Sequence, residues 1–173
     1  MEQGQFQVYT GDGKGKTTAA LGLALRASGA GMKVFIGQFM KAGNSSELSA
    51  LARLRGVDVE CFGSGRGLML RRAAEPEDAA CAKAGAARVL AALRGGYDVV
   101  IADEINCALS FGLLEEADLL TLIDARPPTV ELVFTGRGAC EAVLRRADLV
   151  TEMRAVKHYY AEKGLPARVG IEK

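Results

Sequence analysis

The sequence predicts a single α/β domain over residues 1–173, built on a mostly parallel sheet with helices on both faces. Three observations predict this fold. Short runs rich in β-branched residues alternate with helical patterns, and several of these runs are apolar throughout, which is typical of strands covered on both sides. In addition, a glycine-rich turn separates the first run from the first helical pattern. The chain contains neither an internal repeat nor a linker long enough to divide it.

Six strands are expected, the sixth on weaker grounds than the others, at residues 5–9, 33–39, 57–62, 98–102, 130–134 and 149–153. Residues 19–27 are apolar on nearly every face and predict a buried helix. The helix over residues 76–93 opens with proline and acids, and the one over residues 114–125 begins with acids. Residues 63–72 contain three glycines and three arginines and predict a mobile basic loop, whereas residues 154–173 show no clear period.

The composition excludes several function classes. Hydrophobic residues make up 49% of the chain, which is enough for a core, and the net charge is only +1. Such a balance offers no overall field to hold nucleic acid or an anionic membrane. No apolar stretch approaches the roughly 20 residues of a membrane span, and residues 1–10 lack the pattern of a signal peptide. We therefore expect a soluble, cytoplasmic protein with neither a nucleic acid nor a membrane as its partner.

Cysteine and histidine give little support to metal or nucleophile chemistry. The four cysteines lie 20, 26 and 33 residues apart without a CxxC pair, so we expect buried free thiols rather than a zinc site or disulfides. The single histidine, His158, excludes any site that needs two. We expect His158 to be a hydrogen-bonded structural residue rather than a catalyst.

Residues 10–17, TGDGKGKT, nearly match the phosphate-binding pattern GxxxxGK[ST]. Thr10 replaces the first glycine of the pattern, but a strand precedes the segment and a helix follows it, as the motif requires. We expect its backbone N–H groups to hold phosphate, with Lys16 neutralising charge and the Thr17 hydroxyl binding Mg²⁺. The three glycines of this segment, at positions 11, 13 and 15, can adopt positive φ without steric cost. The alternative is a lysine-containing turn that binds no ligand.

Two further motifs follow predicted strands. Residues 98–104, DVVIADE, end in Asp103 and Glu104, which are candidates for holding Mg²⁺ beside a phosphate loop. The alternative is that these acids only cap a helix over residues 105–112. Arg137 lies in TGRG, after the fifth strand, where it is expected to reach the same phosphates or else to be a solvated arginine in a turn.

Taken together, these motifs resemble the phosphate-loop family of ATP:corrinoid adenosyltransferases, which make adenosylcobalamin. The resemblance covers nearly the whole chain and rests on residues 10–31, 38–43 (QFMKAG), 98–109 (DVVIADEINCAL), 125–138 and 147–172. It implies a P-loop NTPase-like (RecA-like) fold. It also implies transfer of the 5′-deoxyadenosyl group of ATP to the Co(I) of a corrinoid, with release of triphosphate.

The resemblance also implies roles for particular residues. Lys16 and Arg137 are expected to be catalytic through their contacts with the departing triphosphate, and Thr17 and Glu104 to be ligands of a Mg²⁺ cofactor. Arg26 and Gln38 are weaker candidates for the nucleotide pocket and could instead be surface or packing residues. The expected ATP-binding residues are, in full, Gly11, Asp12, Gly13, Lys14, Gly15, Lys16, Thr17, Thr18, Arg26 and Gln38.

On the corrinoid side, this chain departs from the family. Well-known members carry an aromatic pair in the loop after the third strand, where GSGRGLML here offers Arg66 and Leu68. Leu68, Met69 and Leu70 could form an apolar wedge in place of the aromatics, or the loop could accept a precursor without an axial base. The resemblance further implies a homodimer and a flavin-type electron donor that reduces cobalt.

Two other functions remain open at this point. One is a phosphate-loop kinase or ATPase that cleaves the γ-phosphate. The other is a nucleotide-dependent binding module without chemistry of its own. Released triphosphate together with an adenosyl group on cobalt would distinguish the adenosyltransferase from both.

Overall fold

The computed structural model describes residues 2–43, 45–66 and 73–172, and it contains one six-stranded parallel sheet. The strand order is β3-β2-β4-β5-β1-β6. All six predicted strands are confirmed, the sixth included. Their bounds are β1 Phe6–Thr10, β2 Val34–Phe39, β3 Val57–Phe62, β4 Val99–Asp103, β5 Glu131–Thr135 and β6 Leu149–Glu152.

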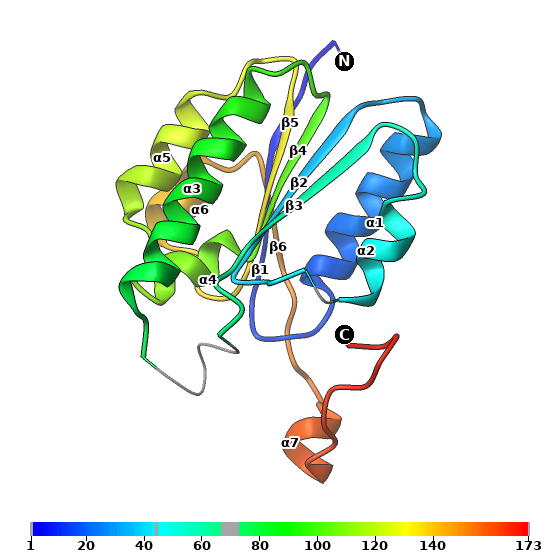
Figure 1. The fold of residues 1–173 in the computed structure, drawn as a ribbon, viewed down its shortest axis with the longest axis vertical. Coiled ribbons are helices and arrows are strands. Elements are labelled where there is room, and N and C mark those ends of the chain that lie inside the picture. The colour runs from blue at the N-terminus through cyan, green and yellow to red at the C-terminus, as the bar shows by residue number, and fades with distance from the viewer. Residues whose placement is uncertain (1, 44, 67–72, 173) are drawn as a thin grey trace.

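Helices cover both faces of the sheet (Figure 1). On one face lie α1 (Lys16–Gly29) and α2 (Ser46–Leu51). On the other lie α3 (Pro76–Leu93), α4 (Ile105–Ser110), α5 (Glu116–Asp124) and α6 (Glu141–Arg146). The last helix, α7 (Tyr159–Lys163), lies apart from both layers, beyond the end of β6. The sequence did not predict α2, α6 and α7, because helices of five or six residues are too short to show a period.

Two apolar clusters hold the layers together. The larger cluster joins the sheet to α3, α4 and α5 and includes the edge-to-face pair of Phe6 and Phe134, whose ring centroids are 4.9 Å apart. The smaller one lies under α1, where Ala20, Ala24 and Ala27 form a buried stripe. The prediction that this helix is buried all round is wrong, because Leu25 on its other side is 58% exposed. Small alanine side chains let α1 approach the sheet closely along that one stripe.

The start of α3 is as its sequence predicts. Pro76 occupies the first turn, and Glu75 and Asp78 form a reciprocal capping box. Along its length, Gly85 faces Phe62, whose ring atoms would lie 2.8 Å from a Cβ at that position. The helix can therefore pack directly on β2 and β3.

The structure also bears on the expected lack of a membrane span and on the expected state of the four cysteines. None of the helices in the described ranges is both long and apolar enough to cross a membrane. The four cysteines are free, as expected, but all four are partly exposed rather than buried.

Candidate functional site

A cavity of about 670 Å³ opens at the carboxyl edge of the sheet, and this volume is in the range of small-molecule sites. Because all six strands are parallel, the segments that follow β1, β4 and β5 meet at this edge. Residues 13–18 form one wall, Lys41 with Ser46 and Glu47 of α2 another, and residues 170–172 of the tail a third. Leu21, Glu104, Arg137 and His158 complete the lining.

Residues 10–17, the phosphate loop, join β1 to α1 and hold the Lys16 side chain inside. Its ammonium donates hydrogen bonds to the carbonyl oxygens of Gly11 and Gly13, both at 2.7 Å. Only 7% of Lys16 is exposed, and this burial lowers the pKa of its ammonium. Lys16 is thus fixed at the centre of the loop, with Glu104 and Arg137 close enough to act on its charge.

The loop glycines meet two different demands. Gly11 and Gly15 use this freedom, with φ of +91° and +119°. Gly13 does not adopt positive φ. Gly13 is instead required by close approach, since its N–H donates to the carbonyl oxygen of Met153 at 2.6 Å and a Cβ would lie 2.6 Å from the same oxygen. The segment after β6 therefore braces the phosphate loop.

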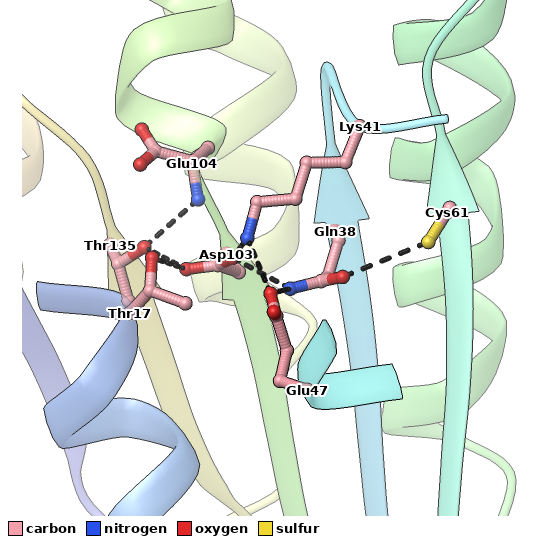
Figure 2. Close-up of polar contacts among 8 residues, drawn as sticks. All are labelled: Thr17, Gln38, Lys41, Glu47, Cys61, Asp103, Glu104 and Thr135. Atoms are coloured by element: carbon pink, nitrogen blue, oxygen red, sulfur yellow. Dashed lines mark hydrogen bonds and ion pairs between the residues drawn. The ribbon is translucent and has the colours of Figure 1, made fainter. Parts of the chain in front are cut away.

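Asp103, at the end of β4, is the centre of a polar cluster beneath the cavity (Figure 2). Its side chain is fully buried. One carboxylate oxygen accepts hydrogen bonds from the hydroxyls of Thr17 at 2.8 Å and Thr135 at 2.7 Å. The other accepts from Gln38 Nε2 at 3.1 Å and Lys41 Nζ at 3.0 Å. These four donors fill the acceptor sites of an ionised carboxylate.

The Glu104 side chain points away from that of Asp103 (Figure 2). Its backbone is left-handed, with φ of +64°, and its N–H donates to Thr135 Oγ1 at 2.9 Å. This turn directs the Glu104 side chain away from Asp103, into the cavity lining (Figure 2). Although Glu104 precedes the first turn of α4, its side chain makes no capping hydrogen bond there, which weighs against the helix-cap alternative. Of the two adjacent acids, only Glu104 lines the cavity.

The TGRG segment brings Arg137 to the cavity from the end of β5. The guanidinium is on an exposed residue, so the structure leaves both alternatives for Arg137 open. Its backbone N–H donates to the sulfur of Cys107 at 3.2 Å. Burial and the negative charge of Glu104 raise the pKa of the Cys107 thiol to about 12. Cys107 is therefore a neutral thiol beside the cavity.

The tail contacts the phosphate loop through Lys14. The Lys14 ammonium lies 2.8 Å from Glu172 Oε1 and donates to the Tyr159 hydroxyl at 3.0 Å. Arg168 binds the same carboxylate, with its Nη2 3.0 Å from Glu172 Oε1. His158 caps α7, because its Nδ1 accepts a hydrogen bond from the N–H of Tyr160 at 3.1 Å. It is hydrogen-bonded as the sequence predicted, and its ring also lines the cavity.

Several predicted site residues lie away from the cavity. Gln38 is fully buried beneath it, and Arg26 is an exposed residue in the last turn of α1. Gly11 and Asp12 belong to the phosphate loop but are not among the residues that line the cavity. Of the residues expected to face the corrinoid, Arg66 forms ion pairs with Glu75 and Glu77, while Leu68, Met69 and Leu70 lie outside the described residues. Residues 67–72 of the expected mobile loop fall in the same range.

Sequence reasoning did not single out Thr135, Lys41 and Glu47 as members of the cluster. Thr135 carries a signal that could have been used, since it ends a buried strand and is itself the first residue of TGRG. Lys41 lies in QFMKAG and Glu47 follows it, yet the contacts of Lys41 with Asp103 and with Glu47 depend on a turn that no pattern encodes. Within the described part of the chain, no three His, Cys, Asp or Glu side chains are grouped as a metal site.

The profile of the family described as ATP:corrinoid adenosyltransferase BtuR/CobO/CobP matches residues 2–172. The chain belongs to this family. It is 40% identical over 173 residues to a corrinoid adenosyltransferase of Pseudomonas aeruginosa, covering 99% of this chain and 84% of that protein. It is 35% identical to a corrinoid adenosyltransferase of Escherichia coli K12, covering 99% and 86%. The corrinoid adenosyltransferase CobA of Salmonella typhimurium is 34% identical, with the same coverage.

Among solved structures, an ATPase segment of EssC from Geobacillus thermodenitrificans superposes with a TM-score of 0.51 at 14% sequence identity. The match covers 98% of this chain and 36% of that one. At this identity the likeness concerns the fold alone, and it supports the predicted P-loop NTPase-like architecture.

Proposed function

We propose that this family member transfers the 5′-deoxyadenosyl group of ATP to the Co(I) of a corrinoid and releases triphosphate. The observation that carries the proposal is the cavity, which combines the phosphate loop with Thr17, Glu104 and Arg137. Backbone N–H groups and four side-chain cations at one site, those of Lys14, Lys16, Lys41 and Arg137, suit a polyanion better than a neutral substrate. Family membership supplies the corrinoid and the transfer reaction.

The reaction asks little of protein acids and bases. The electron pair of Co(I) forms a bond to C5′ of the ribose, and the bond from C5′ to the phosphate oxygen breaks with its pair remaining on triphosphate. Cobalt is formally oxidised by two electrons, and no proton moves. The barrier therefore depends on stabilising the negative charge of the leaving group, as prearranged cations and N–H groups do.

Lys16 and Arg137 are the cations that this proposal assigns to the leaving triphosphate. Lys16 is buried within the loop, so its charge acts at short range and with little screening. Arg137 would approach from the β5 side with a fork of N–H donors suited to phosphate. Lys14 and Thr18 line the same wall and would contact the outer phosphate oxygens.

Mg²⁺ fits the oxygen donors of the site. Thr17 Oγ1 donates a hydrogen bond to Asp103, so its lone pairs are available on the cavity side, and the Glu104 carboxylate lines the same space. A hydroxyl, a carboxylate and substrate phosphates form the usual environment of this ion. When bound, Mg²⁺ would neutralise charge on the triphosphate and make it a better leaving group. Asp103 would hold Thr17 in place from behind.

The remaining parts of the proposal come from the family. We expect the corrinoid to approach from the side of the segment after β3, which contains Arg66 and Leu68. A flavin-type donor would supply the electrons that give Co(I), and the protein would act as a homodimer. We place the reaction in the cytoplasm, where ATP is abundant.

An anaerobic assay tests the proposal. Chemically reduced cob(I)alamin and Mg-ATP are mixed with the protein while the corrinoid spectrum is recorded and triphosphate is measured. Equal amounts of adenosylcobalamin and triphosphate are expected. ADP and orthophosphate in their place would indicate a kinase or ATPase, and ATP binding without either product would indicate a binding module.

A further inference from the structure

The connection from β2 to α2 holds Lys41 against the buried Asp103 (Figure 2). The Lys41 ammonium lies 3.0 Å from Asp103 Oδ2 and 3.3 Å from Glu47 Oε1. Burial lowers the pKa of Lys41, but the charges of Asp103 and Glu47 outweigh this and raise it above its ordinary value. Lys41 is thus a charged residue that links β2 and α2 to β4.

The backbone around Lys41 is built to hold it there. Met40 has φ of +61°, a left-handed conformation that is costly for a side chain of its size. Its N–H is fixed at 3.0 Å from the Phe62 carbonyl. On the other side, a Cβ on Gly63 would lie 2.7 Å from the Lys41 carbonyl oxygen, so only glycine permits this approach. A strained residue and a glycine contact therefore set where Lys41 leaves the sheet.

Lys41 is also the one charged donor among the four hydrogen-bond partners that the described residues give Asp103. Thr17, Thr135 and Gln38 are neutral. A fully buried carboxylate needs a compensating charge, and its oxygens need donors. Lys41 supplies both for Oδ2, and it takes the last acceptor position on the carboxylate.

We propose that Lys41 is a positioning residue, which occupies Asp103 Oδ2 and so reserves a divalent cation for Thr17 and Glu104. An uncompensated Asp103 would draw a cation inward, away from the phosphates above Thr17. With Lys41 in place, Asp103 accepts from Thr17 without ligating the cation itself. The inference rests on the proposed Mg²⁺-dependent binding of ATP, but not on transfer to cobalt.

Nucleotide binding with and without metal tests the inference. ATP affinity is measured by calorimetry for the wild type, Lys41→Met and Lys41→Arg, in Mg²⁺ and in a metal chelator. Lys83→Met is the matched control, because Lys83 is an exposed lysine paired with Asp118 between α3 and α5. In Mg²⁺, Lys41→Met should weaken binding about 10–100-fold, as outer-shell changes at metal sites do, while Lys41→Arg retains most of the affinity. In chelator, all variants should bind alike.

Two results would overturn the inference. Equal losses of ATP affinity in Lys41→Met with and without metal would indicate that Lys41 contacts the phosphates directly. No loss in either condition would make the Lys41–Asp103 pair purely structural. Binding of Mn²⁺, followed by electron paramagnetic resonance in the presence of ATP, gives a second readout that does not need the corrinoid. Failure of adenosyl transfer in the wild type would leave both measurements valid, so the two proposals can fail separately.

A double-variant cycle keeps the test decisive if Lys41→Met does not fold. Asp103→Asn removes the buried charge that Lys41 compensates, so the pair Asp103→Asn with Lys41→Met leaves no unpaired charge at position 103. If Lys41 acts through Asp103, adding Lys41→Met to Asp103→Asn should change the Mg²⁺-dependent gain in ATP affinity less than about twofold. A further loss comparable to that of Asp103→Asn alone would contradict the inference.

Discussion

The hydroxyl of Thr17 donates a 2.8 Å hydrogen bond to Asp103, which joins the first turn of α1 to the end of β4 across 86 positions of sequence. Because the hydroxyl proton is committed to Asp103, the lone pairs of Thr17 are left for the cavity. Thr135 binds the same carboxylate oxygen and also holds the backbone N–H of Glu104. The geometry of the proposed metal site is therefore set by residues that do not line it.

Replacing Lys16 with alanine should abolish transfer, which means a fall of at least about 100-fold. The buried ammonium donates to the carbonyl oxygens of Gly11 and Gly13, and alanine removes both its charge and these hydrogen bonds. Initial rates of adenosylcobalamin formation measure the effect, and urea unfolding checks that the fold is kept. Lys83→Ala is the control. Wild-type turnover in Lys16→Ala would contradict the role assigned to the loop.

Glu104→Gln should raise the Mg²⁺ concentration needed for half-maximal activity by about tenfold or more, since even outer-shell residues shift metal affinity by about 10–100-fold. Glutamine keeps the size of the side chain but loses the charge that suits a hard cation. A Mg²⁺ titration at saturating ATP measures the shift. An unchanged titration would return Glu104 to the helix-cap alternative.

Gly13→Ala should destabilise the protein by about 1–3 kcal/mol, as overpacking does. The new Cβ would lie 2.6 Å from the Met153 carbonyl oxygen, so the loop or the segment after β6 must move. Gly22→Ala, in the middle of α1, meets nothing within 4 Å and should stabilise by about 0.5–1 kcal/mol. Urea unfolding compares the two. Equal stability of both variants would contradict the bracing role of Met153.

Cys107 should resist alkylation at pH 8. A raised thiol pKa means that the reactive thiolate forms only as the pH approaches 12, with roughly a thousandfold less of it at pH 8 than for an ordinary thiol. Mass spectrometry after brief iodoacetamide treatment measures labelling at each cysteine, with unfolded protein as the reference. Glu104→Gln should speed the reaction at Cys107 by removing a nearby negative charge. Rapid labelling of the native wild type would contradict the assignment.

The sequence predicted the strands and the phosphate loop because both are local. A buried strand needs only its own run of apolar residues, and Gly15-Lys16-Thr17 carries its signal between two such elements. The two acids after β4 could not be separated in this way. Asp103 and Glu104 are adjacent, and only the left-handed turn at Glu104 directs one into the cavity and leaves the other beneath it.

Long-range contacts account for most of what was missed. Lys41 reaches Asp103 because Met40 adopts an unusual conformation and Gly63 lets another segment approach, neither of which has a pattern. By resemblance to the family, Gln38 was a weaker candidate for the nucleotide pocket, with a packing role as the alternative. Its side chain is buried and donates to Asp103. A strand end brings residues to the right edge without deciding which of them face the ligand.

The tail that contains Glu172 offers a way to detect a molecule bound in the cavity. Lys163 and Arg168 are exposed, so trypsin could cut on the amino side of the carboxylate that holds Lys14. Such a cut would free residues 170–172, which form one wall of the cavity. A molecule seated against that wall would hold the segment down and slow the cut. Resistance to the protease would then report occupancy of the site, with no need for cobalt chemistry or a label.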